Sequence, residues 1–515
     1  MAISPSNQSV IMAYRVVVSH KFAIVGAGQR SRVETTDMPH NVLFICSDQH
    51  WRDTAGCYGH PLVKTPNIDQ LAAQGTTFTK AYCAAPICVS ARASMQTGRW
   101  VHQLGTWSSA EPYDGSQPGW GHRLQEMGRT SISIGKLHFR SSEDNNGFTE
   151  EMVPVHILNG IGFTSCMVRD HVVPYPANVD FATDIGRGES RYTRYDRKVC
   201  ELTCEWLRDE APKQDQPWSL FASFVAPHHP IVAPDEFYDL YRREDIDMPR
   251  LRGSDERPSH PVLDAATTVW DYDRHFRDDE HIREARLSYY GYVSFLDHNV
   301  GQVLVALEAS GQAANTLVIY TTDHGEMLGN HGMWAKMNMY EESSAIPLIV
   351  KGPGVPEGAQ CDTPASHVDF HQTILKAHEL PLSEADEALS GVALQDLCER
   401  NDDDRGVLSE YHEIGAITGM FMLRWRNWKY IAYPGFAPQL FDLEADPIEA
   451  QDLAHDPAHA DTLSACDAKL RELVDPDEAN DRCFSDQARK IEALGGREAA
   501  LADGEHAYTP MPDLG

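Results

Sequence analysis

The sequence predicts an α/β protein with a large, mostly parallel or mixed sheet sandwiched by helices, and a small C-terminal α+β domain. Short apolar runs that end in polar loops indicate buried strands, because strands covered on both faces are apolar along their whole length. Helix-like segments lie between these runs, and such alternation is typical of a sheet with helices on both faces. Near residue 405 the pattern changes to closely spaced aromatic and apolar residues, which indicates a separate antiparallel unit.

Five apolar runs are the expected strands, and two of them end in an acidic residue. Residues 41–48 read Asn-Val-Leu-Phe-Ile-Cys-Ser-Asp, and residues 316–323 read Thr-Leu-Val-Ile-Tyr-Thr-Thr-Asp. Because ligands bind outside the carboxyl ends of parallel strands, Asp48 and Asp323 are candidate site residues. The other expected strands cover residues 131–134, 220–225 and 346–350, and helices are expected over residues 67–74 and around residues 293–307.

The chain divides into three expected parts. Residues 1–37 mix polar residues with short apolar stretches and are expected to be a poorly ordered N-terminal extension. We expect an α/β domain with the candidate site over residues 38–404, and an α+β subdomain and tail over residues 405–515. Residues 148–196 are aromatic, rich in glycine and weakly periodic, which indicates a long loop at the active site or at a subunit interface.

The charge of the chain excludes some partners. Lys and Arg number 44 against 76 Asp and Glu, which gives a net charge of −32 at pH 7. Such a field repels nucleic-acid phosphates and anionic lipids, so we expect no nucleic-acid partner. No apolar run approaches the roughly 18 to 20 residues that span a bilayer, so we expect no membrane span. An anionic substrate would need a metal ion and local Lys, Arg and His to reverse this field.

The cysteines bear on the compartment. The chain has 11 of them, an odd number scattered along its length, and this pattern does not suggest a disulfide framework. The first 37 residues lack the clean charged, apolar and small-residue regions of a secretory signal. Together these features predict a cytoplasmic protein.

The segment at residues 86–98 carries the most specific motif. It reads Pro-Ile-Cys-Val-Ser-Ala-Arg-Ala-Ser-Met-Gln-Thr-Gly and resembles the signature of the type I sulfatases. In that family a Cys followed four residues later by Arg is oxidised to formylglycine by a formylglycine-generating enzyme. Ser90 stands where the family has Pro, inside the motif that this enzyme reads. The matching positions are Cys88, Arg92, Ala93, Ser94, Thr97 and Gly98.

Four further segments match the same family in chain order, which chance would rarely produce. They resemble its first metal pair, its Gly-Lys-x-His element, its Pro-His-x-Pro element, and its second metal pair with a following lysine. The resemblance implies an alkaline phosphatase-like fold, and the most similar branches are the choline-sulfatases and the phosphonate monoester hydrolases. The four segments are Asp48-Gln49, Gly135 to His138, Pro227 to Pro230 with His228, and Asp323-His324 with Lys336.

The resemblance also implies one divalent metal ion. Carboxylate and amide oxygens suit a hard cation such as Ca²⁺, Mn²⁺ or Mg²⁺, and an imidazole ligand favours Mn²⁺ among them. The implied metal ligands are Asp48, Gln49, Cys88 as formylglycine, Asp323 and His324.

In the implied reaction, hydrated formylglycine attacks the sulfur of a small sulfate ester, and its second hydroxyl then expels sulfate. Basic side chains hold the anionic ester, and two imidazoles move protons. The resemblance assigns Arg92 to holding the hydrate, Lys136 and Lys336 to the ester oxygens, His138 to the base that collapses the hemiacetal, and His228 to protonation of the leaving alcohol.

Several alternatives remain open from the sequence. A phosphonate monoester or phosphodiester hydrolase would use the same nucleophile and metal, and a monoanionic ester suits a single metal better than a dianionic phosphate monoester does. A catalytically silent binding protein would keep the fold without oxidising Cys88. A phosphomutase of the same superfamily would need Ser or Thr at that position. The alcohol half of the substrate is not determined, and a homo-oligomer is compatible with the loop at residues 148–196.

Overall fold

The computed structural model describes residues 39–400, 402–502 and 511–512, so the expected extension at residues 1–37 lies outside the described residues. The largest element is an eight-stranded mixed sheet with the strand order β11-β2-β10-β9-β1-β7-β4-β5. Its strands are β1 (Asn41–Ser47), β2 (Thr76–Phe78), β4 (Thr130–Lys136), β5 (Glu150–Val155), β7 (Trp218–Ser223), β9 (Thr316–Thr322), β10 (Leu348–Lys351) and β11 (Ala359–Cys361).

Strand β1 lies inside this sheet and pairs in parallel with β9 on one side and with β7 on the other. The pairs β4–β7, β4–β5 and β2–β11 are also parallel, whereas β10 runs antiparallel to both β9 and β2. The expected mostly parallel, mixed sheet is therefore confirmed. All five expected strands are present, and β4 continues past residue 134 to Lys136.

The two faces of the sheet can be read from β1. Successive side chains of a strand point to opposite faces. Leu43 and Ile45 join one hydrophobic cluster, while Val42, Phe44 and Cys46 join another. All five are at most 1% exposed. Both faces of β1 are therefore covered, which explains why its sequence is apolar throughout instead of alternating with polar residues.

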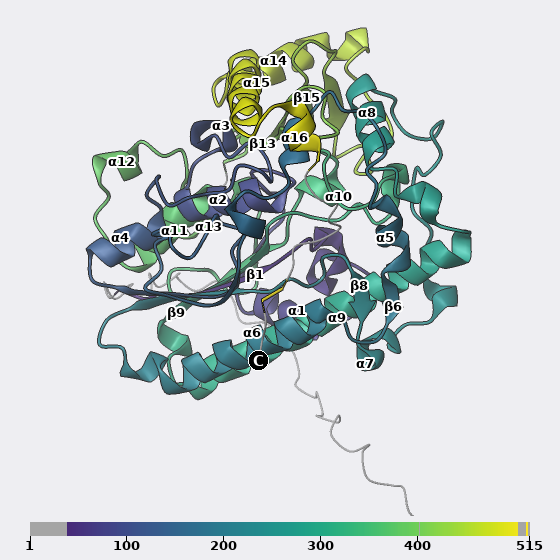
Figure 1. Ribbon diagram of the computed structural model, residues 1–515. Coiled ribbons are helices and arrows are strands. Elements are labelled where there is room, and N and C mark those ends of the chain that lie inside the picture. Colours follow the sequence, from purple (N-terminus) through teal and green to yellow (C-terminus); the bar gives the residue numbers. More distant parts are fainter. Residues whose placement is uncertain (1–38, 401, 503–510, 513–515) are drawn as a thin grey trace, which may run out of the picture. The chain divides into compact units, whose positions relative to one another are not determined.

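Helices cover both faces, as the sequence predicts (Figure 1). The long helices α6 and α9 pack on each other beneath the sheet, together with α1. Four shorter helices cover the opposite face. The lower helices are α1 (Pro66–Ala73), α6 (Arg191–Asp209) and α9 (Asp279–Ala309), and the upper ones are α2 (Cys88–Thr97), α4 (Trp120–Glu126), α11 (Asp369–Ala377) and α13 (Leu394–Glu399).

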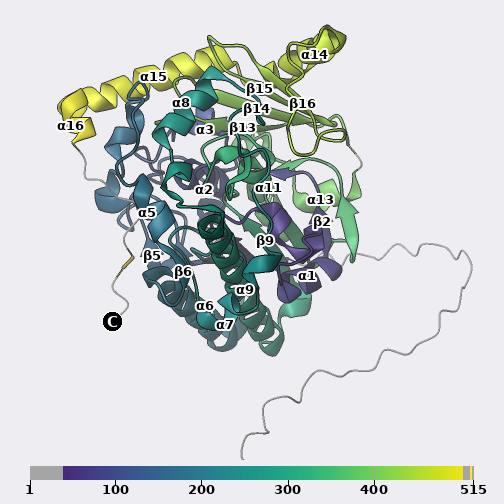
Figure 2. The same ribbon diagram turned by 90° about the vertical axis from the view of Figure 1, so that its right-hand side faces the viewer.

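A second, antiparallel sheet forms the small C-terminal unit. Its four strands run in the order β13-β14-β15-β16, and α14 packs against β14 and β15. Helices α14 and α15 lie at the end remote from α9 in both views (Figures 1 and 2). The predicted antiparallel segment after residue 405 is thus confirmed. The elements are β13 (Val407–Tyr411), β14 (Met420–Trp425), β15 (Trp428–Ala432), β16 (Gln439–Asp442), α14 (Ala460–Arg471) and α15 (Pro476–Ala493).

The prediction of one long loop over residues 148–196 is wrong at both ends. Strand β5 pairs with β4 at the edge of the large sheet, where Pro154 is tolerated because an edge strand has a side without partners. Helix α6 begins at Arg191, and its N-cap Ser190 accepts a hydrogen bond from the Thr193 N–H. Its buried face consists largely of Tyr, Thr and Cys, which hides the helical period. The middle of the segment is irregular, with short helices such as α5 (Asn178–Thr183).

All eleven cysteines lie in the described residues and are free thiols, so the structure contains no disulfide among them. Nine of them are buried. Among the helices that the structure describes, none combines the length and the apolar character needed to cross a bilayer.

Candidate active site

Adjacent strands bring the two candidate aspartates together. In the β1–β9 register Ser47 lies opposite Thr322, so the residues that follow, Asp48 and Asp323, leave the sheet side by side. Both side chains are fully buried. Two acidic groups so close together in the interior need positive charge around them.

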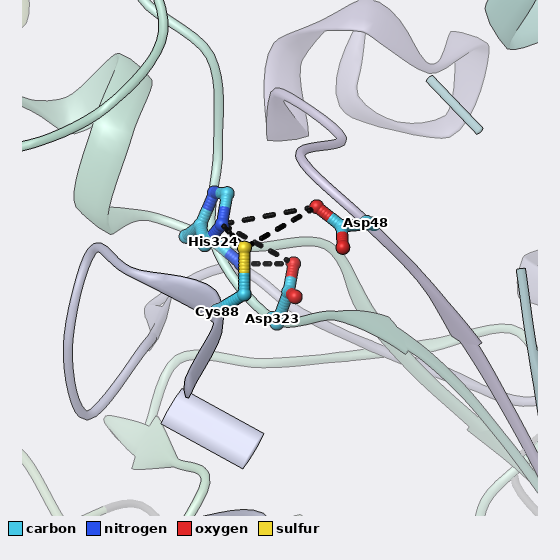
Figure 3. Close-up of side chains that lie close together, drawn as sticks. All are labelled: Asp48, Cys88, Asp323 and His324. Atoms are coloured by element: carbon cyan, nitrogen blue, oxygen red, sulfur yellow. Dashed lines mark hydrogen bonds and ion pairs between the residues drawn. The ribbon is translucent and has the colours of Figure 1, made fainter. Parts of the chain in front are cut away.

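Four side chains converge at this point. Ligand atoms of Asp48, Cys88, Asp323 and His324 all lie within 4.8 Å of one another (Figure 3). Cys88 Sγ is 3.2 Å from His324 Nε2, which lies 3.8 Å from Asp48 Oδ1 and 3.6 Å from Asp323 Oδ1. The sequence places these residues on three separate segments, and the fold joins them.

The donor atoms are oriented as a cation would require. Each aspartate directs Oδ2 to a basic side chain and Oδ1 toward the shared centre. His324 Nδ1 lies 3.1 Å from the Gly325 carbonyl, which can only accept, so Nδ1 carries the proton and Nε2 presents its lone pair. Burial lowers the pKa of His324 to about 4, which keeps the ring neutral. Two carboxylate oxygens and a neutral imidazole fit a divalent cation.

Gln49 follows Asp48 in a left-handed conformation, with φ 66°. Its backbone N–H donates to Asp323 Oδ1 at 3.1 Å, and its Oε1 accepts from Lys336 Nζ at 2.6 Å. Its Nε2 donates to Glu326, a fully buried carboxylate whose pKa is raised by that burial. Glu326 also accepts the Ala335 N–H at 2.6 Å, and so fixes the residue before Lys336. No sequence motif identifies Glu326, although it lies two residues after His324.

Arg92 is the main link between the acidic groups. It lies one helical turn beyond Cys88 on α2 and is 2% exposed. Its Nε donates to Asp323 Oδ2 at 2.8 Å, and a terminal nitrogen lies 3.3 Å from Asp48 Oδ2. The other terminal nitrogen donates to the Lys136 carbonyl at 2.7 Å and to Ser223 Oγ at 2.8 Å. Ser223, at the end of β7, has no motif that would have identified it.

The electrostatic balance of the site is opposite to that of the whole chain. The Lys136 ammonium contacts Asp48 Oδ2 at the end of β4. Burial by itself would raise the pKa of Asp48, but the neighbouring positive charges, Lys136 foremost, hold it well below its usual value. Among the predicted site residues, three cationic side chains face two carboxylates, whereas the whole chain has a net charge of −32. Glu326, which contacts Gln49, is a further buried carboxyl group outside this set. The three cationic side chains are Arg92, Lys136 and Lys336.

Two histidines complete the site. His228 Nδ1 lies 2.6 Å from the His229 carbonyl and therefore donates to it, which leaves Nε2 to accept from Lys336 Nζ at 3.0 Å. His138, in a left-handed conformation with φ 56°, lines the same pocket as Cys88. Burial, with nearby positive charges, holds the pKa of both rings well below the usual value. His229 instead stacks on Phe181 in the pocket wall, at a centroid distance of 4.7 Å.

Cys88 is the first residue of α2 and is 4% exposed. Burial, with the Asp48 carboxylate, raises the pKa of its thiol to about 11, so the thiol stays protonated at neutral pH. A protonated thiol is a weak nucleophile. Ser90, which replaces the family's Pro, is also buried, and its Oγ donates to the Thr106 carbonyl at 2.6 Å.

All ten predicted site residues are therefore brought to one place, through direct contacts or as walls of one pocket. The rest of the pocket is lined by aromatic and aliphatic side chains and by one carboxylate, Glu413. Its Oε2 accepts from the Ser109 N–H at 2.7 Å and from the Ser109 hydroxyl at 2.9 Å. The irregular segment after β5 supplies part of this wall, as expected. The aromatic residues are Phe163, Tyr175, Phe181, Trp270 and Tyr272.

Known proteins share this fold and sequence. The sulfatase profile matches residues 40–379, and the profile described as N-sulphoglucosamine sulphohydrolase, C-terminal, matches residues 329–476. The choline-sulfatase of Rhizobium meliloti (strain 1021) is 30% identical over 430 residues, which cover 82% of this chain and 84% of that protein. Arylsulfatase K of Homo sapiens is 28% identical over 462 residues, 85% of this chain and 83% of the relative.

A solved structure, the phosphonate monoester hydrolase of Agrobacterium radiobacter, has a TM-score of 0.69 at 23% identity and covers 84% of this chain and 95% of its own. The fold and these matches define a hydrolase of the alkaline phosphatase superfamily. Within it, the chain belongs to the sulfatase family and is a sulfuric ester hydrolase. The expected alkaline phosphatase-like fold and the resemblance to the choline-sulfatase branch are confirmed.

Proposed function

We propose that this protein hydrolyses a sulfate monoester to an alcohol and sulfate through a formylglycine made from Cys88. One divalent cation, Ca²⁺ or Mn²⁺ before Mg²⁺, would be held by Asp48, Gln49, Asp323 and His324 together with the modified residue. The observation that carries the proposal is the buried convergence of Asp48, Cys88, Asp323 and His324 within 4.8 Å. When bound, the cation would supply positive charge that draws electrons from the ester and favours an ionised nucleophile.

Modification of Cys88 would replace a weak nucleophile with a strong one. The buried thiol is protonated at neutral pH, because its pKa is raised to about 11. A hydrated aldehyde at this position supplies the attacking hydroxyl, and its second hydroxyl allows sulfate to leave without attack by water on a hindered intermediate. The proposed maturation partner is a formylglycine-generating enzyme.

The other side chains bind the ester and move protons. Arg92 holds Asp48 and Asp323 in register through Oδ2 of each. Lys136 and Lys336 would contact the sulfate oxygens, and their charges offset the negative field of the chain. A proton held between Lys336 Nζ and His228 Nε2, 3.0 Å apart, would pass to the leaving oxygen. His138, a neutral imidazole, would accept the proton that triggers release of sulfate.

The pocket favours an alcohol half that carries a positive charge. Five aromatic rings and the carboxylate of Glu413 line it, and aromatic faces with a carboxylate are the usual means of binding an alkylammonium group. Burial raises the pKa of Glu413 because it disfavours the charged carboxylate, and a cation bound next to it would offset this effect. The name of the related choline-sulfatase points to the same chemistry. We therefore propose an alkylammonium alcohol, such as choline, as the leaving group.

We also propose a division of the chain into two parts, a cellular compartment and partners. The α/β domain at residues 38–404 would hold the catalytic residues, and the α+β part at residues 405–515 would add Glu413 to the pocket wall. Eleven free cysteines support a cytoplasmic location. The proposed partners are the small sulfate ester and the maturation enzyme. A measurement of the mass in solution tests for a homo-oligomer.

Mass spectrometry of the tryptic peptide at residues 81–92 tests the nucleophile. This peptide contains Cys83 as well as Cys88, so Cys83 serves as an internal unmodified thiol. Protein made together with the maturation enzyme should show a loss of about 18 Da at Cys88 alone. An unmodified Cys88 in active protein would exclude the formylglycine route. Turnover of an aryl sulfate against the matching aryl phosphonate then separates sulfatase from phosphonate monoester hydrolase activity.

A further inference from the structure

Asp196 is a buried carboxylate that no part of the proposed reaction uses. It lies on α6, below the large sheet, and is fully buried. Its Oδ1 accepts the Val225 N–H at 2.8 Å, and its Oδ2 accepts the Ala226 N–H at 2.7 Å. Both of its oxygens are thus directed to two consecutive peptide groups, in the loop that follows β7.

The carbonyl groups of the same two residues, Val225 and Ala226, bond to other parts of the site. The Val225 carbonyl accepts the His228 N–H at 2.9 Å, and the Ala226 carbonyl accepts the Asp48 N–H at 3.2 Å. The turn that carries His228 therefore lies between the Asp196 carboxylate and the backbone of Asp48.

The chemistry of the contact indicates a specific role. No basic side chain in the described part of the chain lies within the 4.0 Å ion-pair distance of Asp196, so its partners are the two N–H groups. Burying a carboxylate without a counter-charge costs free energy, and burial raises the pKa of Asp196 to about 7. Each N–H meets a different oxygen of Asp196, so a carboxylate offers an acceptor to both, whereas an amide in the same place would offer its oxygen to only one of them.

We propose that Asp196 is a positioning residue, which fixes the turn that carries His228 against the backbone of Asp48. This inference rests on the proposed function, because it assigns proton transfer to His228. If the turn moves, His228 is displaced from the leaving oxygen. Asp48 loses one backbone hydrogen bond to the turn but stays at the end of β1 beside Asp323, and the nucleophile lies on a separate helix. The loss should then depend on how much the leaving group needs a proton.

The test uses Asp196→Asn with phenyl sulfates of graded leaving ability. The amide would keep one hydrogen bond and oppose an N–H with its own NH₂ group. We expect kcat/KM for 4-methoxyphenyl sulfate to fall about 30-fold and that for 4-nitrophenyl sulfate to fall less than about 3-fold, because only the poorer leaving group needs the acid. Equal losses for both esters would overturn the inference.

Asp297 offers a matched control. It lies on α9, is 2% exposed, and also bonds two consecutive backbone N–H groups, because its Oδ1 accepts from Asn67 and Ile68 at 3.0 and 2.8 Å. Its Oδ2 accepts from Asn67 Nδ2 at 2.8 Å, and the site residues are not involved. Asp297→Asn should lower the melting temperature without changing the ratio between the two esters. If Asp297→Asn also shifts the ratio of kcat/KM between the two esters, the effect of Asp196→Asn reflects a general loss of stability and the inference fails.

His228→Asn distinguishes this inference from the proposed function. If His228→Asn does not reproduce the dependence on leaving group, the proposed role of His228 is wrong. If His228→Asn shows the dependence on leaving group and Asp196→Asn does not, only the proposed role of Asp196 is wrong. When Asp196→Asn is added to His228→Asn, it should cause no further loss of kcat/KM for the 4-methoxyphenyl ester.

If Asp196→Asn does not fold, Asp196→Glu replaces it in the test, because Glu keeps the charge but displaces it. We expect Asp196→Glu to show the same selective loss for the poorer leaving group. Equal losses for both esters would count against the inference.

Discussion

Lys336 Nζ lies 3.0 Å from His228 Nε2. An ammonium can only donate, so the imidazole nitrogen that faces it must accept, and His228 is neutral in this arrangement. The same ammonium donates to Gln49 Oε1 at 2.6 Å. Lys336 therefore joins the proposed proton donor to the proposed metal ligands.

Removing this ammonium should impair the reaction more than the fold. Lys336→Ala is expected to lower kcat/KM for an aryl sulfate by about 100- to 1,000-fold, because a charge on the ester oxygens and the partner of His228 are both lost. Steady-state kinetics and thermal unfolding measure the two effects. Lys351, a partly buried lysine that donates to Gln74 Oε1, provides the control, and Lys351→Ala should leave kcat/KM unchanged.

Two substitutions of Ser90 separate its effect on formylglycine formation from its effect on stability. Ser90→Ala removes the 2.6 Å hydrogen bond to the Thr106 carbonyl and should reduce the free energy of unfolding by about 1 to 2 kcal/mol. Ser90→Pro loses the same bond and restores the residue typical of the family. We expect both variants to show similar melting temperatures, but only the Pro variant to show a higher formylglycine fraction by peptide mass spectrometry. Equal fractions in all three proteins would show that Ser90 does not limit conversion.

Removal of the metal should abolish activity and lower stability. Asp48 and Asp323 have their Oδ1 atoms in a buried, shared centre, so a lost cation leaves their charges less compensated. Dialysis against a chelator is expected to remove about one ion per chain by elemental analysis, to lower the melting temperature and to stop ester hydrolysis. Mn²⁺ or Ca²⁺ should restore all three. In Asp323→Asn the same treatment should change little further, and full chelator-resistant activity in the wild type would contradict the metal proposal.

Glu413 should determine the preference for a cationic alcohol. Glu413→Gln keeps the size of the side chain and its capacity to accept from Ser109, but removes the charge. We expect KM for choline sulfate to rise by about tenfold, with KM for 4-nitrophenyl sulfate changed less than about twofold. A parallel rise for both esters would assign Glu413 to pocket structure alone. No turnover of choline sulfate by the wild type would reject this leaving group.

Acid should destabilise the protein partly through Glu410. Burial alone would raise the pKa of this carboxyl, but His102, 2.9 Å from it, and His412 lower it to about 2, against an ordinary value of 4.5. A depressed carboxyl pKa stabilises the fold above about pH 4.5, and this contribution is lost as pH falls toward 2. In Glu410→Gln the free energy of unfolding should depend less on pH between about 5 and 3 than in the wild type. The exposed Glu472→Gln variant should follow the wild type, and identical pH profiles for all three would contradict the prediction.

Candidate site residues could be predicted from the sequence where their side chains belong to recognisable motifs. Asp48 and Asp323 could be predicted because each ends an apolar strand and belongs to a motif, and parallel strands meet at one edge. Asp196 and Glu326 could not, because they act largely on backbone N–H groups that lie close only in the folded chain. Strand β5 was missed because an edge strand with Pro154 lacks the usual pattern.

The burial of Cys88 sets an order of events during synthesis. Cys88 and His324 contact each other across 236 residues of chain, so the pocket floor cannot close until the later segment has left the ribosome. At about 5 to 20 residues per second, this interval lasts roughly 12 to 47 seconds. After closure the side chain is 4% exposed at the start of a helix, beyond the reach of another enzyme's active site. If Cys88 is converted by a maturation enzyme as proposed, translation speed between these two positions would limit the time available for the conversion, and faster synthesis in a foreign host would shorten it.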